Sequence, residues 1–196
     1  MESLKERQRP SGSEHLLLFE SQAVMRQTIE QTMERLPNGT RRLAALLRTP
    51  IPINSIWSIL TDYDHLSDHI PNLVSSKVIS RDGNRIHLKQ VGAQKLMGLR
   101  FSAQVQLELV ENRDLGLLGF HLLKGDFRRF EGLWKMQELK DGDGTCLLYE
   151  LTVQGCLGMP VALIEQRLRE DLKTNLLAVE QAALNRYSTE NKEGKD

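Results

Sequence analysis

The sequence lacks several features that mark specialised classes of protein. It has 196 residues but only two cysteines, Cys146 and Cys156, which are too few for a disulfide framework. Lys plus Arg number 26 and Asp plus Glu number 26, so the formal net charge is zero. This balance argues against a general nucleic-acid-binding protein, which usually carries a basic excess. It also removes electrostatic attraction as the main route to an anionic membrane.

Long hydrophobic runs are absent as well. No stretch approaches the ~20 apolar residues of a membrane span. The apolar run at residues 16–19 is shorter than the ~7–15 residues of a signal-peptide core. We therefore expect a cytoplasmic protein with reduced thiols. We expect residues 1–27 to form a partly disordered extension, with a short helix over residues 16–26, and residues 188–196 to form a polar tail.

Sequence motifs for nucleotide chemistry and metal binding are missing too. There is no G-x-S-x-G, no phosphate loop and no G-x-G-x-x-G, so we expect neither a nucleotide-dependent reaction nor a cofactor. His65 and His69 lie four residues apart, with Asp62, Asp64 and Asp68 nearby. A zinc site needs at least three protein ligands, and no third ligand has a telling spacing. We expect a polar helix surface here and no metal.

The residues that are present predict short elements first. Residues 28–36 fit either a strand or one helical face, and we favour a strand because Asn-Gly, a strong hairpin signal, follows at residues 38–39. A second strand is expected over residues 41–51. Asn54 is then predicted to cap a short amphipathic helix, followed by a helical stretch that stops at Pro71.

A series of strands with alternating hydrophobicity follows. Residues 99–110 place apolar side chains on one face and polar side chains on the other, which is the period of a half-buried strand. The strands are expected at residues 73–80, 85–91, 99–110, 115–123, 127–139 and 145–154.

One long helix ends the predicted fold. Pro160 suits its first turn, and apolar residues repeat every three or four positions to Ala183. Its opposite face is expected to carry Glu165, Arg169 and Lys173. An antiparallel sheet with one apolar face needs a cover, and this helix is the only element long enough. A curved sheet around one helix leaves space between them, where apolar ligands bind.

This order resembles the START-like (Bet v 1-like, helix-grip) superfamily, and within it the polyketide cyclase/dehydrase and coenzyme-Q-binding branch. Three stretches carry the likeness: IPINSIWSILTDYDHLSDHIPNLV at residues 51–74, GDFRRFEGLWKMQEL at 125–139 and MPVALIEQRLREDL at 159–172. The D-Y-x-x-L-x-x-x-I-P-N and F-x-G-x-W-x-M elements are the most specific. The resemblance implies an α+β helix-grip domain, which we place at residues 28–187, around an apolar pocket that binds lipids, isoprenoid quinones, sterols or polyketides.

The candidate pocket residues share the inward apolar faces of the predicted strands and of the long helix. They are Phe101, Trp134, Met136, Tyr149, Met159, Ile164 and Leu168. The same spacing fits ordinary core, because both roles require an inward apolar side chain. Arg100, His121 or Tyr149 would orient a polar end of the ligand.

Three functions fit the sequence. The first is carriage or chaperoning of a hydrophobic small molecule such as a lipid or isoprenoid quinone, with transient membrane contact. The second is a polyketide cyclase or dehydratase, whose acid and base would come from His121, Tyr149, Arg128 and Glu131. For Arg128 and Glu131 we favour an outward charged strand face, since half of a period-two strand faces water. The third is an interaction protein with a collapsed cavity, in which residues 1–39 bind a partner or form a homodimer.

Overall fold

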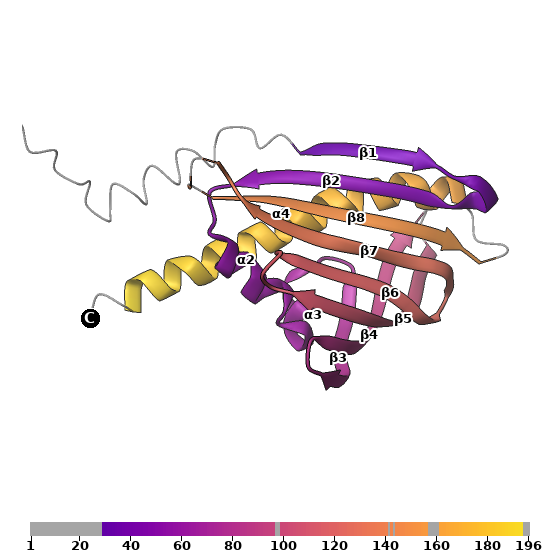
Figure 1. Ribbon diagram of the computed structural model, residues 1–196. Helices are drawn as coiled ribbons and strands as arrows, with labels where there is room; N and C mark the ends of the chain where they lie inside the picture. The colour runs from indigo at the N-terminus through magenta and orange to yellow at the C-terminus, as the bar shows by residue number, and fades with distance from the viewer. Residues whose placement is uncertain (1–28, 97–98, 141, 143, 157–160, 194–196) are drawn as a thin grey trace, which may run out of the picture.

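The computed structural model describes residues 29–96, 99–140, 142, 144–156 and 161–193 (Figure 1). The elements in chain order are β1 (Glu30–Arg35), η1 (Pro37–Gly39), β2 (Arg41–Thr49), α2 (Ile53–Leu60), η2 (Tyr63–His65), α3 (Leu66–His69), β3 (Leu73–Asp82), β4 (Arg85–Leu96), β5 (Leu99–Asn112), β6 (Leu117–Gly125), β7 (Phe127–Glu138), β8 (Thr145–Gly155) and α4 (Val161–Glu193). The helix predicted at residues 16–26 and the helix start at Met159-Pro160 lie outside the described residues.

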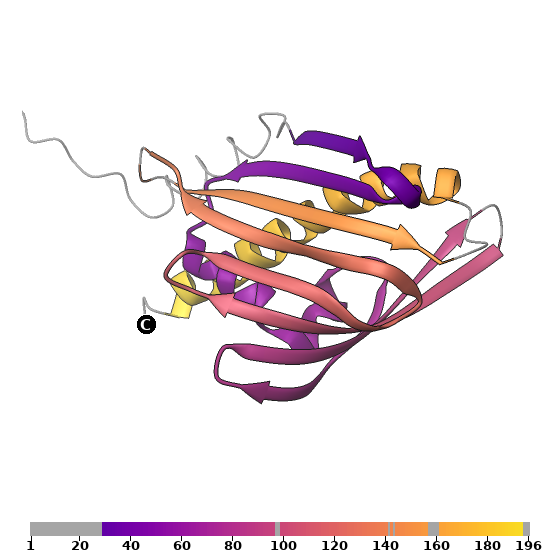
Figure 2. The same cartoon turned by 45° about the vertical axis from the view of Figure 1, so that its right-hand side comes forward.

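The strands form one antiparallel sheet that curves beside the long helix α4. Its eight strands have the order β1-β2-β8-β7-β6-β5-β4-β3. In Figures 1 and 2, α4 runs along one face of the sheet, and α2 and α3 lie on the same side. This arrangement confirms the α+β helix-grip fold. Within the described residues, no helix is both long and apolar enough to cross a membrane.

The core lies between the inner face of the sheet and α4, as the alternating pattern predicts. Leu147 and Leu151 on β8 are buried, and so are Leu172 and Leu176 on α4. All four belong to one hydrophobic cluster. Each such side chain stabilises the fold by about 1.5–3 kcal/mol relative to an exposed position. On the predicted inner face of β5, Val105, Leu107 and Leu109 are buried.

Two local predictions need correction or completion. The strand interpretation of residues 28–36 is confirmed, since β1 pairs antiparallel with β2. The predicted cap is wrong: α2 begins at Ile53 after Pro52, with no side-chain cap. The Asn54 side chain instead accepts a hydrogen bond from Arg113 Nη2 at 3.3 Å. Proline in the extended conformation before the first helical residue can start the helix without a polar cap. At the C-terminal end of the fold, helix α4 continues to Glu193 and so enters the segment 188–196 that was expected to be a polar tail.

Glu165 corrects the prediction for the outer face of α4. Its carboxylate is largely buried and accepts hydrogen bonds from Arg35 Nη2 at 2.8 Å and Arg41 Nε at 2.9 Å. The reason is β1, which extends the sheet over this part of the helix surface. The hydrogen bonds from Arg35 and Arg41 lower the pKa of Glu165 from 4.5 to about 2. The ion pair therefore ties the first strand pair to α4 wherever Glu165 is ionised.

We predict that Glu165→Gln lowers the melting temperature by a few degrees near neutral pH. A carboxyl with a depressed folded-state pKa contributes stability above its unfolded pKa and loses it as pH falls through the folded value. The gap between wild type and variant, followed by circular dichroism, should therefore close between about pH 4.5 and about pH 2. Glu34→Gln, which removes an exposed ion pair with Arg42, should change little. An equal Glu165→Gln gap at both ends of the range would contradict the assignment.

Gly132 occupies a point where two strands approach too closely for a side chain. It lies in β7 opposite Leu151 of β8. A Cβ built on Gly132 would lie 2.0 Å from the Glu150 carbonyl oxygen and 2.8 Å from Phe120 Cζ. The first contact is with backbone, so the clash cannot be relieved by a rotamer change. The central glycine of the F-x-G-x-W element is therefore required by the close approach of the Glu150 backbone.

We expect Gly132→Ala to destabilise the protein by about 1–3 kcal/mol, because a methyl group is forced into packed backbone. Gly119→Ala is the matched control on the neighbouring strand β6, since a Cβ there meets nothing within 4 Å. Urea unfolding of both variants measures the difference. If the two variants lost the same stability, close packing at Gly132 would not be the cause.

Candidate functional site

A cavity of about 370 Å³ lies between the sheet and the N-terminal half of α4. Its walls come from the α3 segment with the loop after it, from the first residue of β3, and from β4, β5, β7, β8 and α4. The lining is formed by Leu66, Ile70, Pro71, Asn72, Leu73, Gln90, Gly92, Ala93, Gln94, Phe101, Ser102, Ala103, Val105, Phe127, Phe130, Tyr149, Leu151, Arg167, Leu168, Asp171, Leu172 and Asn175. The cavity has therefore not collapsed, contrary to the premise of the third functional alternative.

Most of the wall is apolar, because the inward positions of the strands and helix carry aliphatic and aromatic side chains. Phe127 and Phe130 of β7 lie against each other, with ring centroids 5.3 Å apart. Phe101 of β5 also lines the cavity, yet 45% of its surface is exposed. A side chain that faces both the cavity and water marks a place where the cavity opens. The exposed Pro71 lines the cavity as well.

Several polar lining residues are connected by hydrogen bonds to one carboxyl group, that of Asp171 on α4. Its Oδ1 accepts a hydrogen bond from Asn72 Nδ2 at 3.3 Å, and its Oδ2 accepts one from Gln94 Nε2. The Gln94 Oε1 in turn accepts a hydrogen bond from Arg167 Nε at 3.3 Å. Arg167 also forms an ion pair with Glu170 at 2.7 Å. Three elements thus hold Asp171 at the cavity wall.

Burial governs the ionisation of the cavity groups. It raises the pKa of Asp171, although Gln94 and Arg167 act in the opposite direction. Burial also raises the pKa of Tyr149, and the negative charge of Asp171 adds to that shift. Desolvation disfavours the charged form of each acid, so both effects have the same sign. The cavity therefore holds a carboxyl group that binds its proton more tightly than usual and a phenol that stays neutral.

Tyr149 is the tyrosine among the described lining residues of the cavity. Its ring stacks on Trp134 with centroids 4.0 Å apart, which fixes the orientation of the side chain. The Tyr149 hydroxyl makes no hydrogen bond to a described residue. Since every fully buried side-chain polar atom of the described residues has a partner, this hydroxyl is not fully buried. The hydroxyl therefore remains accessible from the cavity and can donate a hydrogen bond to a ligand.

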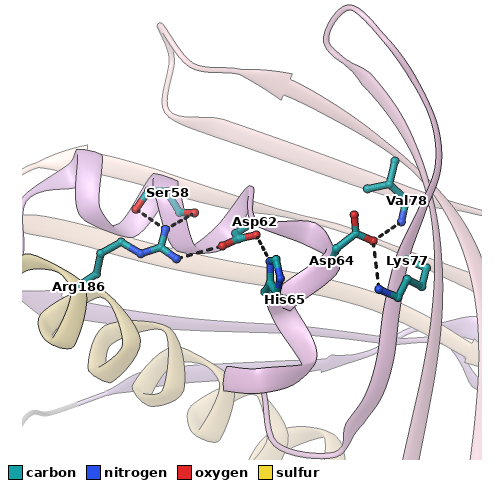
Figure 3. A network of polar contacts seen from close by, with 7 residues as sticks. All are labelled: Ser58, Asp62, Asp64, His65, Lys77, Val78 and Arg186. Atoms are coloured by element: carbon teal, nitrogen blue, oxygen red, sulfur yellow. Dashed lines mark hydrogen bonds and ion pairs between the residues drawn. The ribbon is translucent and has the colours of Figure 1, made fainter.

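Polar contacts hold the segment that leads into the α3 wall (Figure 3). Asp62 accepts a hydrogen bond from Arg186 Nη2 of α4 at 3.0 Å and contacts His65 Nδ1 at 2.7 Å. Asp64 accepts one from the Val78 backbone N–H of β3 at 3.0 Å. The hydrogen bond to Asp62 raises the pKa of His65. These contacts fix η2 between α4 and β3, so the cavity wall that follows is held at both sides.

The pair His65 and His69 belongs to this surface. His65 is exposed and contacts Asp62, and His69 lies at the end of α3. Among the described residues, no group of three or more His, Cys, Asp or Glu side chains is placed to hold a metal ion.

The structure separates the seven candidate pocket residues into three sets. Phe101, Tyr149 and Leu168 line the cavity. Trp134 and Met136 are buried on the same inner face of β7 but are not lining residues, because the cavity wall on β7 is formed by Phe127 and Phe130. The last set, Met159 and the side chain of Ile164, lies outside the described part of the chain. The side chain of Arg100, expected to orient a polar end of the ligand, lies outside it too.

Three of the four candidate catalytic residues lie away from the cavity. His121 is exposed, with Nε2 at 4.0 Å from Glu108 Oε1. Glu131 contacts Arg129 on the strand surface. Phe120 and Phe130 point inward, so strand alternation turns the residues that follow them outward. Arg128 is exposed at an irregularity in the pairing of β7 with β8.

Sequence reasoning missed the polar group of the cavity. Asp171 and Asn175 follow Leu168 and Leu172 at helical spacing, so they share the inward side of α4. A polar residue between apolar positions of one helical face was the available signal. Gln94 gave no comparable signal, because it lies in a strand segment without clear alternation.

Comparison with known proteins finds one family and many solved structures. The family model described as polyketide cyclase / dehydrase and lipid transport matches residues 49–180. No curated protein matches the sequence.

The solved structures that this chain resembles share its fold. The Zhui aromatase/cyclase of a Streptomyces species has a TM-score of 0.66 at 12% identity, over 76% of this chain and 96% of its own. A STAR-related lipid transfer protein of Xanthomonas axonopodis has a TM-score of 0.64 at 14% identity, over 79% of this chain and 93% of its own. A protein of Thermus thermophilus has a TM-score of 0.64 at 22% identity, over 74% and 97%.

Proposed function

Because the chain belongs to the polyketide cyclase/dehydrase and lipid transport family, we propose that it binds an apolar small molecule in its cavity, to carry or protect it. The observation that carries this proposal is the cavity itself, whose wall is mostly apolar and includes a hydrogen-bonded polar group around Asp171. Burial of apolar ligand surface would supply the affinity, at about 25 cal/mol per Å². The polar group would orient the ligand.

The size of the cavity limits what it encloses. Its volume of about 370 Å³ lies near the lower end of the ~300–1,000 Å³ range of ligand pockets. A compact ring system or a medium-length chain fits this space. A lipid or an isoprenoid quinone would place one end inside and leave the remainder at the opening beside Phe101.

A polyketide cyclase or dehydratase is the second candidate function, favoured by one observation. Asp171 and Tyr149 are titratable groups in the wall of the same cavity. The raised pKa of Asp171 brings it closer to the range in which a carboxyl group transfers protons at neutral pH. This function requires turnover. Cyclisation of a short poly-β-ketoester by the wild type, lost in Tyr149→Phe, would favour it over carriage.

We predict that Ala103→Phe abolishes ligand binding by filling the cavity. Ala103 lines the cavity from β5, so an aromatic ring there would occupy space meant for the ligand. Titration with the neutral dye N-phenylnaphthylamine should show affinity at least about tenfold weaker than wild type, which corresponds to ~1.4 kcal/mol. Native mass spectrometry should also lose any copurified apolar molecule.

Ala44→Phe is the matched control for this experiment. Ala44 lies in β2 between the buried Leu43 and Ala45, so its side chain points to the other face of the sheet. Its dye affinity should equal that of the wild type. A folded wild-type protein that bound neither the dye nor any copurified molecule would contradict the proposed function. Equal binding by Ala103→Phe and Ala44→Phe would place the ligand elsewhere.

A further inference from the structure

The polar part of the cavity has an uneven distribution of charge. Arg167, Glu170 and Asp171 form one group on α4, with one cation and two carboxyl groups. Arg167 donates from Nη1 to Glu170 at 2.7 Å and from Nε to Gln94 at 3.3 Å. The single cation is therefore already paired at the outer side of the group. Among the described lining residues, Asp171 and Arg167 are the ones with charged side chains.

Asp171 is also fixed in place. Asn72 and Gln94 each donate to one of its oxygens, from the loop before β3 and from β4. The backbone carbonyl of Asn72 accepts a hydrogen bond from the Ala93 backbone N–H of β4 at 2.8 Å. This bond fixes the Asn72 backbone, from which the side chain reaches Asp171. A carboxylate that cannot rotate away exerts its full field on a ligand. Like charges in a partly desolvated site repel strongly.

The donor that remains for a ligand is neutral. Tyr149 lines the cavity, and its hydroxyl has no hydrogen-bond partner among the described residues. A hydroxyl can donate to a carbonyl or a hydroxyl oxygen without needing a charge on the ligand. Tyr149 and Asp171 thus have complementary roles, since one offers a hydrogen bond and the other imposes a cost on negative charge.

From this geometry we infer that Asp171 is a specificity-determining residue that excludes carboxylate ligands, such as free fatty acids. The cavity then selects apolar molecules whose polar end is an uncharged carbonyl or hydroxyl group. This inference rests on the proposed function, because it concerns the same cavity, and it narrows the class of ligand. It assigns the cavity a chemical preference that apolar burial alone would not produce.

The test uses two probes of equal carbon number, methyl octyl ketone and decanoate, each displacing N-phenylnaphthylamine at about pH 8. The wild type should bind the ketone much more tightly, but the ketone is also the more apolar probe, so the variant decides. Asp171→Asn should strengthen decanoate binding by about tenfold and leave ketone binding within about twofold. Asp68→Asn, an exposed change of the same charge on α3, should alter neither value.

A charge-reversed probe keeps the test valid if Asp171→Asn does not fold. Decylammonium has the same chain length as decanoate and the opposite charge, so wild-type protein alone can compare them. Decylammonium should bind at least about tenfold more tightly than decanoate. Equal affinities, or tighter decanoate binding, would overturn the inference.

The two levels of the proposal fail differently. If the ketone displaces the dye but the ratio of ketone to decanoate affinity is the same in Asp171→Asn as in the wild type, the role of Asp171 is overturned. The ligand-binding function is then still supported. A folded wild-type protein that binds neither the dye nor the ketone overturns both.

Discussion

The fold depends on one geometric constraint: a single helix must cover one face of an eight-stranded sheet. Strands lie ~4.8 Å apart, so eight of them span roughly 34 Å if flat, whereas a helix with its side chains is only ~10–12 Å wide. The sheet therefore curves, and the short helices α2 and α3 cover more of the same side. Close contact is reached between α4 and the strands β2 and β8. The cavity lies where that contact ends.

This constraint also explains where the polar residues of the cavity are found. The middle of α4 packs in the core through Leu176 and Val179, both fully buried. Toward its N-terminal half, the same side of the helix faces open space, so Asp171 can be inward and still avoid tight apolar packing. A carboxyl group there costs less than it would in a filled core, because partners and space are available. Function is thus located where packing is incomplete.

The close-packed parts show the opposite behaviour. Gly132 and Gly119 are both strand glycines, yet a side chain is excluded only at Gly132, where the Glu150 backbone approaches. Similarly, Glu165 appears from its spacing to be a surface residue of α4, but β1 brings Arg35 and Arg41 beside it. In both cases a neighbour distant in sequence sets the environment. Local periodicity contains no information on such neighbours.

The sequence by itself determined the order of the elements, the antiparallel sheet, the long final helix and the inward face of each strand, because these follow from periods of two and 3.6 residues. It also indicated Phe101, Tyr149 and Leu168 as inward residues. Only the tertiary structure separated cavity wall from filled core and gathered Asp171, Gln94 and Asn72 into one group. Periodicity states which side of an element is covered, whereas sheet curvature and long-range contacts decide what covers it.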